Sequence, residues 1–180
     1  MSDDRGEAAA APTFYLRDLP SYEAIAARTA RYPDVDPAAV EATYVLFRVS
    51  TDGLAAFEAF LGRHGCSIGR FTPLAVLNRD PDVGLAPSVL AERCGVTRAT
   101  MTGLLDGLER DKLVRRLTNR GDRRMVTVVL TAKGREFMDG LLPDYYRRVA
   151  ALMGKMTHDE KRLLVDLVKK VNEGIPAVTA

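Results

Sequence analysis

The sequence predicts a mainly α-helical protein with a small β-hairpin, or wing, that directly follows a pair of short helices. Three observations lead to this fold class. Apolar residues recur at helical spacing over most of the 180 residues. Capping residues, Gly and Pro stand where these segments would begin and end. Residues 114–118 and 125–130 instead form short runs rich in β-branched residues, separated by a Gly-containing turn, which is typical of a hairpin.

The N-terminal part is predicted to hold a short helix and then a long one. A helical pattern over 22–31 is ended by Pro33. Asp36 and Pro37 form a stronger helix start, because Asp caps free backbone amides and Pro suits the first helical position. We therefore expect one long helix over 37–62, stopped by the glycines that follow it.

The middle of the chain is predicted to fold as a helix-turn-helix followed by the wing. Gly95 breaks the helical pattern after a short segment, and Thr97 can cap the helix that comes next. The expected elements are helices at 68–79, 87–93 and 98–111, a one-ladder strand at 83–85, and the two hairpin strands.

Two helices are expected after the wing. Thr131 can cap a helix over 132–154, in which Pro143 should bend or split the helix because it lacks a backbone donor. The run Thr157-His158-Asp159-Glu160 is a capping box that opens a helix over 158–173.

This order divides the chain into three predicted regions. Residues 1–36 form an N-terminal extension with a short helix, and residues 67–131 form the winged helix-turn-helix DNA-binding domain. Residues 37–66 and 132–180 form a helical dimerisation region. An isolated winged domain does not need these apolar flanking helices, so we expect them to pair with each other and with a second chain.

Positive charge is concentrated in the segment that contains the helix pair and the wing. The whole chain has a formal charge of +2, but residues 85–135 hold eleven Lys or Arg against five Asp or Glu. The segment therefore carries +6 and the remainder −4. A basic patch on a groove-reading layout is the pattern expected for binding to double-stranded DNA.

Two groups of residues are expected to contact DNA. On helix 98–111, an apolar stripe would pack inward and leave short polar side chains outward. There Arg98 could bind guanine or a phosphate, and Gly103 would permit close approach. At the wing, an Asp could orient an Arg through a bidentate bond toward the minor groove. The predicted contacts are Arg98, Thr100, Thr102, Gly103, Arg120, Asp122, Arg123 and Arg124.

Other classes of protein receive little support. No run of about 18 apolar residues is present, and the N-terminus lacks the pattern of a signal peptide, so we expect a cytoplasmic protein without a membrane partner. The two His residues accompany no nucleophile motif, phosphate loop or metal-ligand spacing. We therefore expect no enzymatic activity, no catalytic residues, no cofactor and no metal.

Two alternatives to a ligand-responsive DNA-binding protein stay open at this point. Cys66 lies in a loop-like stretch beside Arg63 and His64 and could sense thiol oxidation, which requires a low thiol pKa and access to oxidant. Cys66 and Cys94 are otherwise two small buried residues. The second alternative is a winged helix that binds protein, for which a basic wing is not expected.

The run GVTRATMTGLLDGLERDKLVRR followed by DRRMVTVVLTAKG resembles the MarR family of bacterial transcription regulators over residues 37–173. Its hallmark, an Asp-x-Arg wing and then Leu-Thr-x-x-Gly, stands here as Asp122-Arg123-Arg124 and Leu130–Gly134. The resemblance implies a homodimer on a palindromic operator, with the recognition helix in the major groove and Arg124 in the minor groove, oriented by Asp122. It implies a repressor released by a small phenolic or anionic effector or by thiol oxidation.

The chain also departs from family patterns. Arg120 adds a charge to the wing tip, and the extension lacks the Trp of the urate-responsive branch, so urate is not expected as the effector. The resemblance places an effector between the dimerisation helices and the winged domain. Candidate lining residues are Phe57, Phe60, His64, Arg70 and Phe71, although the three aromatic residues could instead be core and the other two surface residues.

Overall fold

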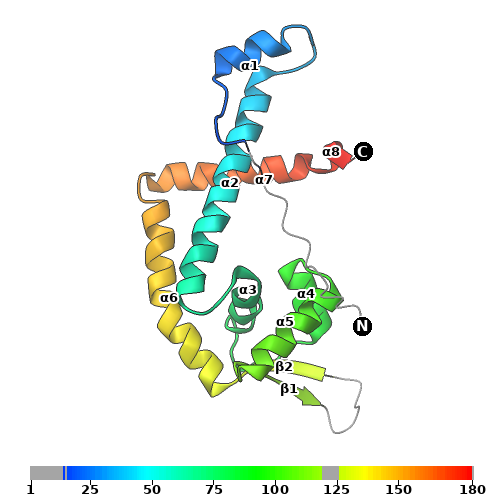
Figure 1. The fold of residues 1–180 in the computed structure, drawn as a ribbon, viewed down its shortest axis with the longest axis vertical. Helices are drawn as coiled ribbons and strands as arrows, with labels where there is room; N and C mark the ends of the chain where they lie inside the picture. The colour runs from blue at the N-terminus through cyan, green and yellow to red at the C-terminus, as the bar shows by residue number, and fades with distance from the viewer. Residues whose placement is uncertain (1–13, 15, 119–125, 180) are drawn as a thin grey trace, which may run out of the picture.

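The computed structural model describes residues 14, 16–118 and 126–179. These residues fold into helices with one two-stranded sheet (Figure 1). In chain order the elements are α1 (Tyr22–Thr29), α2 (Pro37–Arg63), α3 (Ile68–Leu77), α4 (Pro87–Cys94), α5 (Arg98–Arg110), β1 (Val114–Thr118), β2 (Val126–Leu130), α6 (Ala132–Leu152), α7 (His158–Gly174) and α8 (Pro176–Thr179).

The predicted fold class is confirmed, and most boundaries agree within two residues. The expected strand at 83–85 is present as a single bridge between Leu85 and Val128. Pro143 bends α6 but does not split it, since one continuous helix runs through the proline and follows a curved path (Figure 1). The short helix α8 was not predicted. Within the described part of the chain, no helix has the length and apolar composition that crossing a membrane requires.

The long helix α2 organises the molecule (Figure 1). Helix α1 packs against it near one end, and α3 packs against it near the other. Helix α3 also contacts α4, α5, α6 and β2, so it joins the long helices to the helix-turn-helix and the wing. Helix α7 extends across the view and contributes no buried residue.

The core lies where the helix-turn-helix, the wing and the start of α6 meet. Its fully buried side chains include Leu74 of α3, Leu90 of α4, Leu105 of α5, Val128 of β2 and Met138 of α6. Burial of one large aliphatic side chain stabilises a fold by about 1.5–3 kcal/mol. This core therefore fixes α5 and the root of the wing as one unit.

The Leu-Thr-x-x-Gly motif ties the wing to α6. The Thr131 hydroxyl accepts a hydrogen bond from the Gly134 amide (3.0 Å) and donates one to the Lys112 carbonyl oxygen (2.6 Å). Lys112 sits at the turn after α5 with φ of 62°. A Cβ at position 134 would lie far inside contact distance of the Leu113 carbonyl oxygen, so only glycine allows this approach.

Candidate DNA-binding surface

Helix α5 has one buried face and one exposed face, as the apolar spacing predicts. Met101, Leu105 and Leu108 are completely buried against the rest of the helix-turn-helix. The opposite face, which we call the α5 surface, is solvent-exposed and consists of Arg98, Thr100, Thr102, Gly103 and Asp106. Four of these five residues are the predicted DNA-contacting residues of this helix.

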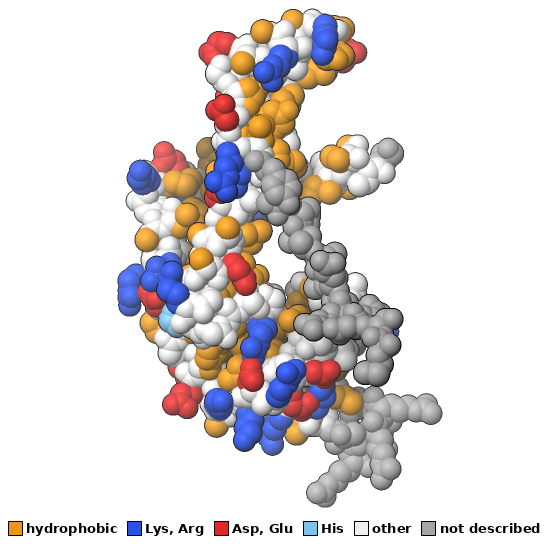
Figure 2. All heavy atoms as spheres, viewed as in Figure 1, with side chains coloured by type: hydrophobic (Ala, Val, Ile, Leu, Met, Phe, Trp, Pro, Cys, Tyr) orange, Lys and Arg blue, Asp and Glu red, His pale blue; other side chains and the backbone are white. Residues whose placement is uncertain are grey.

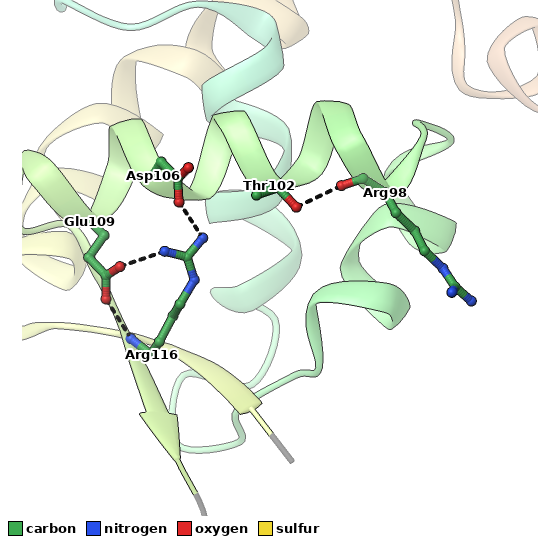
Figure 3. Close-up of polar contacts among 5 residues, drawn as sticks. All are labelled: Arg98, Thr102, Asp106, Glu109 and Arg116. Atoms are coloured by element: carbon green, nitrogen blue, oxygen red, sulfur yellow. Dashed lines mark hydrogen bonds and ion pairs between the residues drawn. The ribbon is translucent and has the colours of Figure 1, made fainter. Parts of the chain in front are cut away.

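Local hydrogen bonds fix the side chains at the start of the α5 surface. The Thr97 hydroxyl caps the helix by accepting from the Thr100 amide (3.1 Å), and the two threonine hydroxyls lie 2.9 Å apart. The Thr102 hydroxyl donates to the Arg98 carbonyl oxygen (2.9 Å), which leaves its methyl group and an acceptor lone pair for a partner. The Arg98 side chain extends away from the helix (Figure 3).

Gly103 lies in the middle of this surface with open space in front of it. A Cβ built at Gly103 would meet no atom within 4 Å. The free protein therefore has no steric need for glycine here, and in a helix interior glycine costs about 1 kcal/mol relative to alanine. Close approach of another molecule to the backbone at Gly103 would explain why glycine is present here.

Arg116 of β1 holds two acidic residues of α5, a group that we call the Arg116 clamp (Figure 3). Its guanidinium donates to Glu109 Oε2 (2.6 Å) and to Asp106 Oδ1 (2.7 Å), and its backbone amide donates to Glu109 Oε1 (2.9 Å). Burial works against the charged guanidinium, but the hydrogen bonds and the two carboxylates outweigh it and raise the pKa of Arg116. The clamp fixes the wing strand to α5 and pairs a cation with Asp106 of the α5 surface and with the neighbouring Glu109.

Sequence reasoning did not identify Arg116 as a site residue. The available signal was the pair Asp106 and Glu109, spaced so that both carboxylates lie on one side of α5, followed by a basic strand. Which strand residue meets them depends on the packing of β1 on α5.

The predicted wing contacts Arg120, Asp122, Arg123 and Arg124 lie within 119–125, outside the described residues. The strands that flank this segment pair in a register that runs from Val114 opposite Leu130 to Thr118 opposite Val126.

The five predicted effector residues lie in different surroundings. The rings of Phe57 and Phe71 both pack in a tilted arrangement against that of Tyr145 of α6, with ring centroids 5.5 and 5.0 Å away, between α2, α3 and α6. Arg70 instead forms an ion pair with Asp111 after α5. Phe57 and Phe60 line a cleft of about 270 Å³ between α2 and α6, whereas His64, Arg70 and Phe71 are not among its lining residues.

The two cysteines lack the environment of a thiol sensor. Cys66 is buried, and burial raises the pKa of its thiol, despite the opposing charge of Arg70. Cys94 is half-buried, and burial raises the pKa of its thiol as well. A sensor needs a lowered pKa and access to oxidant, so this geometry favours the structural interpretation of both cysteines.

A helix-turn-helix whose second helix exposes short polar side chains, followed by a β-hairpin, defines a winged helix DNA-binding protein. A MarR family model matches residues 64–125. The HTH-type transcriptional repressor YetL of Bacillus subtilis (strain 168) is 33% identical over 153 residues, which cover 85% of this chain and 92% of YetL. The chain therefore belongs to the MarR family of transcriptional regulators, as its wing motif predicts.

Solved structures show the same fold. The S. aureus MepR–DNA complex matches with a TM-score of 0.65 at 19% identity and covers 74% of this chain and 95% of MepR. Bordetella bronchiseptica BpsR, described with regulation of its DNA binding by 6-hydroxynicotinic acid, matches with a TM-score of 0.64 at 21% identity and covers 73% and 98% of the two chains.

Proposed function

We propose that this protein is a transcriptional repressor that binds a palindromic operator as a homodimer and leaves it when a small ligand binds. The observation that carries the proposal is the α5 surface, where a helix otherwise packed into the core exposes Arg98, two threonines and an unobstructed Gly103. A duplex major groove accepts an α-helix that presents such side chains. The DNA complex of MepR and the repressor YetL support this assignment.

The proposed contacts divide between the two grooves. Helix α5 enters the major groove with Arg98, Thr100, Thr102 and Gly103. The wing carries Arg120, Asp122, Arg123 and Arg124 to the neighbouring minor groove, where negative potential favours a guanidinium. In this arrangement Asp122 orients Arg124.

Dimerisation is proposed to involve the apolar faces that the single chain leaves exposed. In α7 the residues Leu163, Leu167 and Val171 recur at helical spacing, and each is about half exposed. Figure 2 shows further hydrophobic side chains along α2 between its middle and α1. Exposed apolar stripes of this length are typical of protein interfaces. The occupant that we propose is the equivalent region of a second copy.

The proposed roles follow the three predicted regions of the chain. Residues 67–131 bind DNA, residues 37–66 and 132–180 form the dimer, and residues 1–36 are an extension attached to α2 through α1. We further propose a small aromatic or anionic effector, in line with the printed description of BpsR.

The sharpest test is Gly103→Ala. In the free protein the added methyl group meets nothing, so the variant should be more stable by about 1 kcal/mol, a rise in Tm of roughly 2–4 °C. If the backbone at Gly103 approaches DNA, the same methyl group should weaken operator binding at least tenfold. Fluorescence anisotropy with duplexes from the promoter region of the neighbouring genes would measure the second effect.

Gly107→Ala is the matched control. It places the same methyl group into open space on the same helix, one turn further along and at the edge of the α5 surface. We expect a similar gain in stability and a smaller change in DNA binding. Operator affinity that is unchanged in Gly103→Ala would contradict the placement of α5 in the groove, and absence of any sequence-specific duplex binding would contradict the function itself.

A further inference from the structure

We propose that Asp106 determines part of the operator sequence by accepting a hydrogen bond from the amino group of a cytosine in the major groove. The inference rests on the DNA binding proposed above and adds a base contact to the four residues predicted for α5. Asp106 follows Thr102 by four residues and Gly103 by three, so all three lie on one side of the helix. Its side chain is 54% exposed. A helix that enters the groove with Thr102 and Gly103 therefore brings Asp106 to the base edges as well.

The two carboxylate oxygens of Asp106 have different surroundings. Oδ1 accepts a hydrogen bond from Arg116 Nη2 (2.7 Å). In the part of the chain that the structure describes, Oδ2 accepts no hydrogen bond, and it points away from the guanidinium (Figure 3). Since an ionised carboxylate accepts hydrogen bonds but cannot donate them, Oδ2 requires a donor as its partner.

Glu109, the other acid of the Arg116 clamp, has both of its oxygens occupied. Oε2 accepts from the Arg116 guanidinium (2.6 Å), and Oε1 accepts from the Arg116 backbone amide (2.9 Å). Glu109 therefore attaches β1 to α5 at two points by itself. The wing strand does not depend on Asp106 for its attachment, and of the two acids Asp106 is the one that keeps an oxygen for a partner outside the protein.

Arg116 makes a carboxylate acceptable at a surface that faces DNA. An aspartate without a cation would be repelled by the phosphates on both sides of the groove, and the guanidinium bonded to Oδ1 offsets this repulsion. The same bond holds the carboxylate in one orientation before DNA binds. Gly103 has no side chain to stand between Asp106 and a base, and the space in front of it is open. The short Asp106 side chain can therefore reach a base edge.

Cytosine is the base whose major-groove edge fits such an acceptor. Its N4 amino group is a donor with no acceptor beside it on the same base. Adenine also has an amino group, but the neighbouring N7 is an acceptor that repels a carboxylate oxygen. Guanine and thymine present acceptors at this edge, which a carboxylate cannot bind. The free oxygen of Asp106 therefore selects a C·G pair.

The test selects duplexes from a random library with the full-length protein and determines the base frequency at each position of the half-site. The wild-type protein should select a C·G pair at one position of each half-site. Asp106→Asn should select T·A there. Arg116 only donates, so it keeps the oxygen of the new amide, and the NH2 group takes the place of Oδ2 and donates to thymine O4. In anisotropy titrations the wild type should bind the C·G operator about tenfold more tightly than the T·A operator, and Asp106→Asn should reverse this order.

Two further variants show whether the free oxygen is responsible. Asp106→Ala removes both oxygens and should select no particular base at this position. Glu109→Gln is the matched control, because it replaces the other carboxylate of the clamp by its amide and removes the same charge. It should keep the C·G preference of the wild type. The Tm of each variant shows that it is folded under the conditions of the selection.

The proposal is overturned if either Asp106 variant selects the same half-site as the wild type, or if the position that changes is not a C·G pair in the wild-type half-site. It is also overturned if Glu109→Gln loses the same preference, because the charge of the clamp and not a base contact then sets it. A wild-type protein that selects no sequence contradicts both this inference and the proposed function. A defined wild-type half-site that the Asp106 variants leave unchanged contradicts this inference alone.

Discussion

Replacing Arg116 by alanine tests whether the Arg116 clamp contributes to the stability of the protein and to its affinity for DNA. The substitution removes two charged hydrogen bonds to Asp106 and Glu109 and leaves both carboxylates without their cation. Arg115→Ala is the matched control, since it removes the same charge from the neighbouring exposed position of the same strand. Any difference between the two variants therefore reports the clamp rather than net charge.

The magnitude follows from the exposure of the pairs. A hydrogen bond to a charged group contributes about 1.5–3 kcal/mol when buried, and an exposed ion pair only about 0.2–1 kcal/mol. The Arg116 side chain is 28% exposed, but its partners Asp106 and Glu109 are 54% and 38% exposed, so solvent screens both pairs. We expect a loss of about 1–2 kcal/mol in the free energy of unfolding, or roughly 3–6 °C in Tm.

DNA affinity should fall for a separate reason. The uncompensated carboxylates of Asp106 and Glu109, on and beside the α5 surface, would repel phosphates, each by about 0.5 kcal/mol at a separation of about 8 Å in water. The predicted loss relative to Arg115→Ala is therefore roughly fivefold in Kd. Adding Asp106→Asn and Glu109→Gln to Arg116→Ala should restore affinity but not stability.

Thermal unfolding at fixed protein concentration and anisotropy titrations at two salt concentrations measure these effects. If Arg116→Ala and Arg115→Ala have the same Tm and the same Kd, the clamp has neither role. If the triple variant binds DNA no better than Arg116→Ala, repulsion is the wrong explanation for the loss of affinity.

Three further predictions concern packing, thiol chemistry and assembly. Gly134→Ala should cost about 2 kcal/mol or more by calorimetry, because its Cβ collides with a carbonyl group, whereas Gly140→Ala in open space on the same helix should stabilise. Because burial raises the pKa of Cys66, its thiol stays protonated at neutral pH and its contribution to stability is lost only as pH rises above the ordinary thiol range. Iodoacetamide at pH 7 should therefore label it more slowly than a model thiol, and labelling at the model rate would contradict its burial. Leu167→Asp should dissociate the homodimer in light scattering while Lys169→Asp leaves it intact, and a monomeric wild type would rule out the proposed assembly.

Local patterns in the sequence were sufficient to predict helices α1 to α7 and the orientation of α5. The 3.6-residue period of Met101, Leu105 and Leu108 fixes which side of α5 packs inward, and capping residues fix where it starts. The hairpin followed from two β-branched runs around a turn. These predictions succeeded because each depends on residues that are close in the chain.

Contacts between residues that are distant in the sequence could not be predicted from local patterns. The ion pair between Arg70 and Asp111, 41 residues later, was not predicted, because it depends on the packing of α3 on α5, which brings their ends together. Arg63 and Arg148, which line the cleft between α2 and α6 together with the predicted Phe57 and Phe60, were missed for the same reason. The two walls of this cleft come from helices separated by residues 64–131, and no periodicity indicates which side of α6 faces α2.

Three contacts between distant residues end at the turn after α5, and their position bears on how a ligand signal would reach DNA. The Arg70 ion pair with Asp111, the Lys133 hydrogen bond to the Asp111 carbonyl oxygen (3.0 Å) and the Thr131 hydrogen bond to Lys112 all end at the turn after α5. The Arg116 clamp holds the adjoining half of α5. Among the described residues, the start of α5, with Arg98 and Thr102, has only local hydrogen bonds. Movement of α3 or α6 would therefore carry α5 and the wing root together, so the effector proposed above would change the position of the recognition helix and not its shape.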